Sequence, residues 1–407
     1  MEAVLYLTYI AIILLLGIIC TIISNKIKIP NILLLIIVGM ILSKFSYNGQ
    51  VLIAFPSVFL TSIGILALVM IIFDSASRFK LREFDILSTK AVKLTFIFLA
   101  LNLIFLTFFT IIVLDLKFTL YSVLIGALFS ALMSGTDPAA VLAMFGKTKI
   151  KLFEFLEVES LLNTPLVVLL PFIIIDLMNK IKLGGIIGGD ILNQLFPFAG
   201  DLLLRLIAGI GAGVLVGLII FKIMKKEYSE KLSPLALIAA ALLTYILAEG
   251  LGGNGVLAVT TMGLFFGNVY IKQKPQLMEF SSLFANSLEI LVFVLVGFII
   301  SVPLTSKFLI TSFVLFVISL FIRHMAILIV FRQSPYTLSE KVFMSLNVQK
   351  GIAVAVVAFT LTILNIPAID LVLNMILMFM LYSIILSTIM VRFSRYFVRT
   401  HIKEGSK

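Results

Sequence analysis

The sequence predicts an all-α polytopic membrane protein with about 13 transmembrane helices. Of its 407 residues, 61% are hydrophobic and only 13% are charged, and the mean hydropathy is +1.23. Soluble domains do not reach such values. At about 20 residues per span, the successive apolar runs and their short connections account for nearly the whole chain. We therefore expect a single transmembrane domain over residues 1–407, ending in a short basic cytoplasmic tail at 392–407.

Hydropathy divides the chain into thirteen expected spans. The second span is short enough to be tilted or partly re-entrant. Pro30, Pro303 and Pro367 fall at span ends, where a proline starts or stops a helix at little cost. The expected spans cover residues 4–24, 30–44, 51–74, 92–115, 119–145, 153–178, 200–223, 233–250, 254–271, 281–301, 306–331, 341–364 and 367–391.

Lys and Arg are distributed unevenly between the loops. The loops after odd-numbered spans carry eighteen of them, and those after even-numbered spans carry five, Lys44, Lys117, Lys180, Lys182 and Lys307. Because cytoplasmic loops are enriched in Lys and Arg, we expect the N-terminus outside and the C-terminus inside, in the plasma membrane. The net charge of +11 then reflects membrane topology, and no nucleic-acid partner is expected.

One polar segment, Ser134-Gly135-Thr136-Asp137-Pro138, interrupts the fifth span. A carboxylate at bilayer depth is costly and is seldom retained without a function. Pro138 lacks a backbone N–H, and Gly135 precedes the acid, so we expect the helix to break beside Asp137. The freed backbone carbonyls would then face the same cavity as the carboxylate.

A second polar segment lies in the sixth span. Ser160, Asn163 and Thr164 have the spacing i, i+3 and i+4, which places them on one face of a helix. Together with Thr136 and Asp137 they predict an oxygen-rich pocket suited to a monovalent cation. A carboxylate that holds either a proton or a cation is the minimum requirement for exchange. Alternatively, Asp137 caps a helix and the polar face joins two helices by hydrogen bonds.

Two cationic residues lie inside later spans. Arg323 needs a buried partner, which Glu157 or Glu159 can supply, and direct contact with substrate is the alternative. Lys350 interrupts the twelfth span within Asn347–Gly351, where we expect it to counter helix-end dipoles; snorkelling to the interface is its alternative. Two interrupted helices, one in each half of a membrane chain, predict an inverted-repeat transporter.

The remaining charged and reactive residues are less informative. Asp74, at the end of the third span, either attracts cations to a cytoplasmic entrance or is a solvated helix end. Arg205, near the start of the seventh expected span, can snorkel to the interface. Cys20 is the only cysteine, so no internal disulfide can form. Because the sequence has neither a His and Cys cluster nor a phosphate-binding glycine loop, we expect no cofactor and no enzymatic activity.

Several motifs follow one another in a fixed order through nearly the whole chain. They are Ser134-Gly135-Thr136-Asp137-Pro138-Ala139-Ala140, Glu157-Val158-Glu159-Ser160-Leu161-Leu162-Asn163-Thr164-Pro165, Leu247–Gly250, Gly255–Val259, Gly263–Asn268, Arg323 and Gln349-Lys350-Gly351. In this order they resemble the monovalent cation/proton antiporters of the NhaP type, in which the last motif is usually Pro-Arg-Gly. The resemblance implies thirteen spans, a core domain beside a dimerisation domain, homodimers, an elevator-like movement, and pairing of Arg323 with Glu159.

The sequence departs from this family at one central position. In the family, Asn163 is normally followed by an aspartate that carries the cation and the proton, whereas here the residue is Thr164. A hydroxyl can coordinate Na⁺ or K⁺ but does not exchange a proton near neutral pH. Asp137 or Asp74, both at positions where the resemblance implies ion-site acids, can take over that exchange. Alternatively, the protein moves or senses a cation without proton coupling, or the substitution has inactivated it.

We therefore expect a cation/proton antiporter that moves Na⁺ or K⁺ by alternating access, with Asp137 as the carrier. A purely structural role is disfavoured, because buried acids and broken helices are costly to retain. The residues expected at the site are Asp137 and Asp74, the neutral ligands Thr136, Ser160, Asn163 and Thr164, the core ion pair of Glu159 and Arg323, and Lys350 at the helix crossing.

Overall fold

Helices form most of the chain that the computed structural model describes. The described residues are 2–27, 30–47, 50–51, 55–80, 86–137, 151–182, 191–226, 232–299, 302–303, 305–334, 336–362, 366 and 369–397. Pro138, Pro367 and the tail residues 398–407, which entered the sequence predictions, lie outside this part of the chain.

The elements follow the expected order, with one small departure from an all-helical chain. Residues 46–51 include a two-stranded antiparallel hairpin in which Ser46 pairs with Val51 and Tyr47 with Gln50. The elements are α1 (Glu2–Ile27), α2 (Asn31–Leu42), β1 (Ser46–Tyr47), β2 (Gln50–Val51), α3 (Ser57–Ser77), α4 (Ile86–Leu101), the π-helical turn η2 (Asn102–Leu106), α5 (Thr107–Val113), α6 (Leu120–Met133), α8 (Lys151–Lys182), α9 (Ile191–Lys226), α10 (Leu232–Gly250), α11 (Gly255–Asn268), α12 (Lys274–Ile299), α13 (Ser306–Val330), α14 (Leu338–Leu346), α15 (Ile352–Leu361), α16 (Ile369–Arg392) and α17 (Ser394–Phe397).

Each of the thirteen expected spans coincides with one apolar helix. Within the described residues, nine helices are long and apolar enough to cross a membrane, and four apolar helices, α2, α6, α11 and α15, are shorter. At 1.5 Å per residue, the 10 to 14 residues of these shorter helices reach only about 15–21 Å, less than the roughly 30 Å hydrocarbon core. Two of them are short because of the predicted interruptions: α6 ends at the first one, and α15 begins at the second.

Several helix boundaries differ from the expected ones. Helix α3 begins at Ser57, six residues after the expected start of the third span, and the expected first residue, Val51, lies in the hairpin. Helix α12 starts at Lys274 and α9 at Ile191, each well before the expected span, because hydropathy marks the apolar part of a helix and not its polar ends. Arg205 therefore lies inside α9, where it pairs with Asp176 of α8 at 2.6 Å. The expectation that it lies near a helix start was wrong, because α9 begins fourteen residues earlier, at Ile191.

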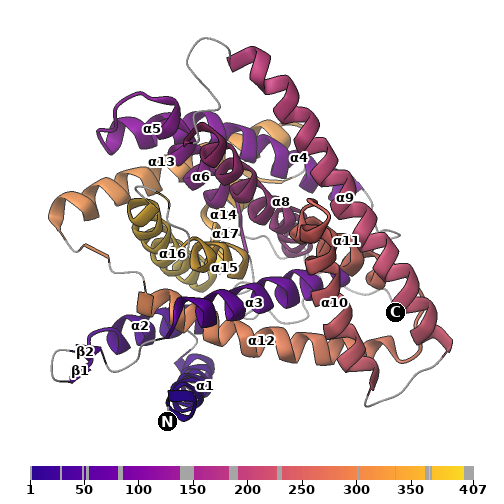
Figure 1. Ribbon diagram of the computed structural model, residues 1–407. Coiled ribbons are helices and arrows are strands. Elements are labelled where there is room, and N and C mark those ends of the chain that lie inside the picture. Colours follow the sequence, from indigo (N-terminus) through magenta and orange to yellow (C-terminus); the bar gives the residue numbers. More distant parts are fainter. Residues whose placement is uncertain are drawn as a thin grey trace, which may run out of the picture.

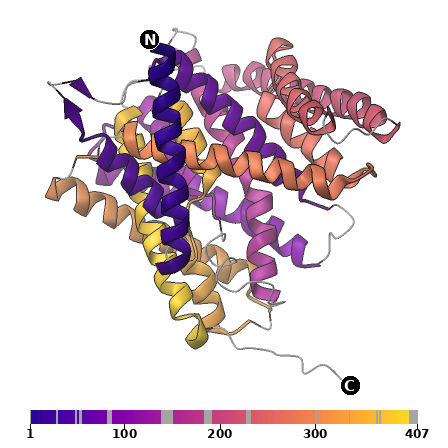
Figure 2. The ribbon, with the colours of Figure 1, turned by 90° about the horizontal axis from the view of Figure 1, so that it is seen from below.

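The helices form two groups that meet at α15 (Figure 1). In one group, α12 packs against α2 and α3, and α11 packs against α3, α9 and α10. In the other, α8 packs against α4 and α6, and α13 against α4 and α14. Helix α15 contacts α3 and α12 of the first group and α8 and α16 of the second. Figure 2 shows α1 along the edge of the first group, beside α2 and α12.

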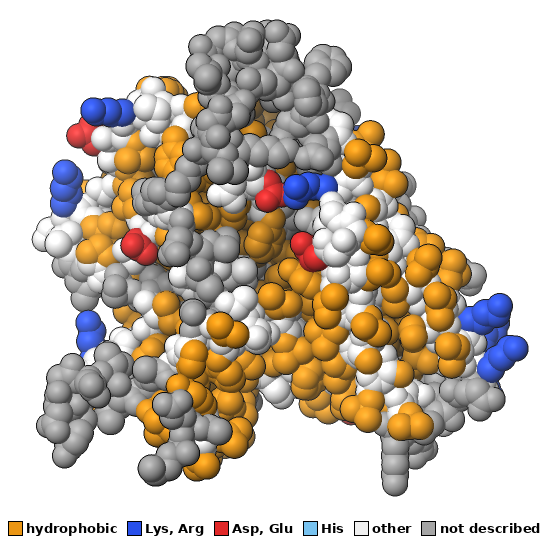
Figure 3. Space-filling view, viewed as in Figure 1, with side chains coloured by type: hydrophobic (Ala, Val, Ile, Leu, Met, Phe, Trp, Pro, Cys, Tyr) orange, Lys and Arg blue, Asp and Glu red, His pale blue; other side chains and the backbone are white. Residues whose placement is uncertain are grey.

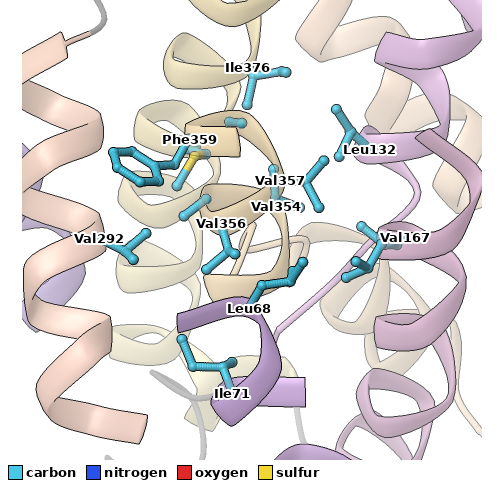
Figure 4. Close-up of a cluster of buried hydrophobic side chains, with 14 of the residues drawn as sticks. Leu68, Ile71, Leu132, Val167, Val292, Val354, Val356, Val357, Phe359 and Ile376 are labelled. Carbon is cyan, nitrogen blue, oxygen red and sulfur yellow. The ribbon is translucent and has the colours of Figure 1, made fainter. Parts of the chain in front are cut away.

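The core surrounds the half-helix α15. Val354, Val356, Val357 and Phe359 of α15 are buried, and apolar side chains of α3, α6, α8, α12 and α16 lie around them (Figure 4). The outer surface is also apolar: on the face in Figure 3, hydrophobic side chains cover much of the lower right, and charged side chains are few. Exposed leucines and isoleucines occur along α9 from Leu203 onward and along α10, as expected for helices in contact with lipid.

Two glycines allow close approach of α2 and α12. A methyl group on Gly39 of α2 would overlap the carbonyl of Val294, and one on Gly297 of α12 would overlap the carbonyl of Ile36. Small residues permit such contact between helix backbones, which is a main source of helix association in membranes. This pair of helices therefore holds α12 in a fixed position beside α3.

We expect Gly297→Ala to lower the unfolding free energy by about 1–3 kcal/mol, because the added methyl group forces α2 and α12 apart. Gly211→Ala in α9 is the matched control, because no heavy atom lies within 4 Å of its new methyl group. Thermal unfolding in detergent compares the two variants. Equal midpoints for Gly297→Ala and the unmodified chain would contradict the prediction.

Candidate functional site

The two interrupted segments cross each other and are joined by direct hydrogen bonds. Asp137 donates its backbone N–H to the carbonyl of Gln349 at 2.8 Å. In the opposite direction, the Lys350 Nζ donates to the carbonyls of Met133 at 2.6 Å and Gly135 at 2.8 Å. Backbone groups freed by the two breaks are thus satisfied inside the protein, as the bilayer requires.

Local side chains explain where the helices stop. The Ser134 hydroxyl donates to the carbonyl of Ala131 at 2.6 Å, at the last turn of α6. Helix α14 starts with a capping box of Thr337 and Glu340. It ends where the Asn347 side chain donates to a carbonyl of its last turn at 2.7 Å, which competes with continuation of the helix. The chain is then extended at Gly351 before α15 begins.

The charges at the crossing complement the helix dipoles. Lys350, only 2% exposed, lies at the C-terminal end of α6, where the dipole is negative. Asp137 lies at the N-terminal end of α15, where the dipole is positive, and its carboxylate packs so closely that a methyl group on Gly351 would overlap it.

A small cavity opens beside the Asp137 carboxylate. The volume of this cavity that a water molecule can reach is about 20 Å³. By the same measure, roughly 10–15 Å³ is enough for one water molecule. It therefore has room for a single water molecule or a single dehydrated cation. The lining residues are Gly135, Thr136, Asp137, Asn163, Thr164, Val167, Gly351, Ile352, Ala353 and Val354.

Neutral oxygens gather around this cavity. Asn163, 3% exposed, donates from Nδ2 to the Thr136 hydroxyl at 2.8 Å, which joins α8 to the broken end of α6. The Thr164 hydroxyl donates to the carbonyl of Ser160 at 2.8 Å, so its oxygen keeps lone pairs for a cation. Of the described residues expected at the site, four line the cavity: Asp137, Thr136, Asn163 and Thr164. Ser160 is not in the lining and contacts Thr164 through its backbone carbonyl.

A buried ion pair lies next to the crossing. Arg323 of α13 and Glu159 of α8 are both 0% exposed and form a bidentate pair, with Nη2 at 2.6 Å from Oε2 and Nη1 donating to Oε1. Glu157, the other acid considered as a partner, is exposed. The ring of Phe98 lies 4.8 Å from the guanidinium carbon and 6.0 Å from the Lys350 Nζ, so both cations face the same aromatic side chain.

Asp74 occupies a separate position. It is 8% exposed; its Oδ2 accepts hydrogen bonds from Arg78 Nε and Nη2 at 3.1 and 2.8 Å, and its Oδ1 accepts one from Ser282 of α12 at 2.8 Å. The acid is therefore not a solvated helix end. Among the described residues that line the cavity, Asp74 does not appear.

One acid near the site was not expected from the sequence. Glu289 lies half-buried on α12, seven residues and about two turns from Ser282, and its charge acts on those of Asp137 and Asp74. The signal was present as a lone acid inside the apolar run 281–301. The motifs did not include it, and so the third acid was missed.

The architecture and the site together define a class of protein. An all-helical membrane fold in which two interrupted segments cross beside a half-buried acid is typical of secondary transporters. The protein-family model described as "Sodium/hydrogen exchanger, transmembrane" matches residues 10–394, and the chain belongs to this family. The resemblance inferred from the motifs is confirmed, and the chain is a transporter and not an enzyme.

Individual relatives agree with this assignment. The probable Na(+)/H(+) antiporter 2 of Methanocaldococcus jannaschii is 29% identical over 377 residues, which cover 88% of this chain and 85% of the relative. The K(+)/H(+) antiporter NhaP of Alkalimonas amylolytica is 27% identical over 305 residues, 74% of this chain and 50% of the relative. The solved structure of the sodium proton antiporter MjNhaP1 from M. jannaschii at pH 8 has the same fold, with TM-score 0.77, 24% identity, and coverage of 96% and 99%.

We expect Glu159→Gln to destabilise the protein by about 3–5 kcal/mol, because it leaves the Arg323 guanidinium buried without its counter-charge. Asp176→Asn is the matched control. It breaks the pair with Arg205, whose side chains are 42% and 40% exposed, and should cost less than about 1 kcal/mol. Thermal unfolding measures both, and similar losses in the two variants would show that burial of the pair is unimportant.

We also expect Gly351→Ala to weaken cation binding at least tenfold while the protein still folds. The methyl group would displace the Asp137 carboxylate from the cavity. Gly250→Ala, which meets no heavy atom within 4 Å, is the control. Titration of thermal stability with Na⁺ or K⁺ gives the affinity, and unchanged affinity in Gly351→Ala would mean that Asp137 does not hold the ion.

Proposed function

We propose that this protein exchanges Na⁺ or K⁺ for protons by alternating access, with Asp137 as the carrier. The observation that carries the proposal is the cavity at the helix crossing, which has room for one particle and is lined by a carboxylate and neutral oxygens. The names of the relatives, antiporters of Na⁺ or of K⁺ with protons, support the same activity.

The chemistry of the proposed carrier is a competition for one carboxylate. When Asp137 is ionised, its oxygens can hold a cation, and Thr136, Asn163 and Thr164 replace part of the hydration shell. When a proton occupies the carboxyl group instead, the cation loses its main electrostatic attraction. Glu159 and Arg323 neutralise each other, so they contribute little net charge to this competition.

The arrangement of the helices is consistent with a moving part and a static part. In the proposal, the group of α4, α6, α8, α13 and α15 is the core that carries the ion past α3 and α12. The protein forms a homodimer through the other group, whose helices α9 and α10 expose many apolar side chains. The N-terminus lies outside and the basic C-terminal tail inside, in the plasma membrane.

A second candidate function is cation transport or sensing without proton coupling. Thr164 lines the cavity and does not exchange a proton near neutral pH. In this alternative, the cation moves down its own gradient, or the substitution leaves an inactive antiporter. The two candidates differ in proton movement. In the antiporter a cation gradient drives protons across the membrane in the opposite direction, and in the uncoupled protein it does not.

The test is cation-driven dissipation of a pH gradient in proteoliposomes. We expect the unmodified chain to exchange protons for Na⁺ or K⁺ and Asp137→Asn to lose this activity, because its amide cannot carry the charge that holds the cation. Asp370→Asn, at an exposed acid in the first turn of α16, is the control and should retain it. If the unmodified chain is silent and Thr164→Asp restores exchange, the chain is an uncoupled or inactivated antiporter.

A further inference from the structure

One ion pair joins the two groups of helices directly. Arg205 of α9 donates from Nη1 to Oδ2 of Asp176 of α8 at 2.6 Å. Helix α8 belongs to the group that bears the cavity, and α9 belongs to the group of α10, α11 and α12. The other ion pairs among the described residues each stay within one group. The contact between Asp176 and Arg205 therefore depends on how the two groups lie relative to each other.

Arg205 is fixed to the second group through its backbone. Its carbonyl accepts the backbone N–H of Asn254 at 3.1 Å, at the start of α11. One turn further along α9, a methyl group on Gly209 would overlap the Asn254 carbonyl. The backbones of α9 and α11 are thus in direct contact beside Arg205, which is the kind of packing that holds helices together in a membrane. The guanidinium is therefore attached to a firmly packed part of this group.

Asp176 is attached to the helix that bears part of the cavity. It lies twelve residues beyond Thr164 on α8, or about 18 Å along the helix axis. Its neighbours Ile175 and Met178 are buried in the hydrophobic core. A displacement of α8 past α9 therefore separates the carboxylate from the guanidinium. Because a hydrogen bond is lost beyond about 3.5 Å, the pair exists only close to the present arrangement of the two groups.

Partial exposure allows this pair to break and form again. Its two side chains are 40% and 42% exposed, so water can solvate both charges after they separate. Arg205 also lies near the start of the apolar stretch Leu203–Lys226, where a long side chain can reach the membrane interface. The pair of Glu159 and Arg323 is fully buried and has no such alternative. The exposed pair can thus open and close, whereas the buried one stays closed.

We propose that Asp176 and Arg205 form a latch, an ion pair that holds the cavity-bearing group in its present position and opens when that group moves. The inference rests on the proposed alternating access. A contact made in only one of two positions shifts the ratio of their populations by its own interaction free energy. For an exposed ion pair this shift is about twofold to fivefold. Neither residue lines the cavity, so the latch acts on transport through the position of α8.

The first test measures how fast Ala353→Cys, in the cavity lining, reacts with a membrane-impermeant maleimide from each side of the membrane. Intact cells expose one side and inverted vesicles the other, and Cys20→Ala removes the only other thiol. We expect Asp176→Asn and Arg205→Gln each to change the rates about twofold to fivefold, upward from one side and downward from the other. The charge swap of Asp176→Arg with Arg205→Asp should restore the unmodified rates.

Asp370→Asn is the control for this test, because it removes the charge of an exposed acid in the first turn of α16 and should leave both rates unchanged. Unchanged rates in both single variants would overturn the latch. A charge swap that behaves like the single variants would overturn it as well, because the effect would not depend on the ion pair. A shift in the rates without proton exchange by the unmodified chain would support the latch and refute the proposed function.

A reducible cross-link gives a second readout. In the Cys20→Ala background, Asp176→Cys and Arg205→Cys joined by a short bis-methanethiosulfonate should lower cation/proton exchange at least tenfold, and reduction should restore it. The matched control is Tyr6→Cys with Phe59→Cys, because these rings stack at 6.4 Å between α1 and α3 of the same group. The control should keep its exchange when cross-linked. Undiminished exchange by protein cross-linked at 176 and 205 would overturn the inference.

Discussion

The structure depends on the requirement that two interrupted segments satisfy their own backbone groups inside an apolar membrane protein. The breaks at 134–137 and 347–351 meet this requirement through each other: the Asp137 N–H uses a carbonyl of one segment, and the Lys350 amine uses carbonyls of the other. The same contacts position an acid and an amine close together. The Lys350 side chain therefore has a structural role at the crossing, because its removal would leave the carbonyls of Met133 and Gly135 without this hydrogen-bond donor.

The pair of Glu159 and Arg323 gives the crossing a neutral and rigid neighbour. A bidentate geometry with no exposure fixes α8 relative to α13, and α8 in turn carries Asn163 and Thr164 to the cavity. The pair is internally compensated, so it adds little net charge to the crossing beside Asp137 and Lys350. The pair therefore stabilises the packing of α8 against α13 without lining the cavity itself.

Much of the fold could be predicted because its signals are local in sequence. Apolar runs marked the spans, and the motif spacing brought Thr136, Asn163 and Thr164 to one cavity with Asp137. Contacts between distant helices could not be predicted in this way. Asp74 accepts a hydrogen bond from Ser282, more than two hundred residues away, and Asp176 forms an ion pair with Arg205 of another helix. Such partners are decided by how the helices pack and not by the local sequence pattern. Glu289 was missed for a different reason: as a lone acid in the apolar run 281–301 it was visible in the sequence, but it belongs to none of the motifs.

The shared aromatic ring has a consequence for the energetics of the core. Phe98 faces both the Arg323 guanidinium and the Lys350 amine, so neither cation can shift without altering the packing of the other. Substitutions at these three positions should therefore be non-additive, with a measurable coupling free energy in a double-mutant cycle. Phe98 is not among the residues that line the cavity, yet its ring links the packing of Lys350 to that of Arg323 on α13.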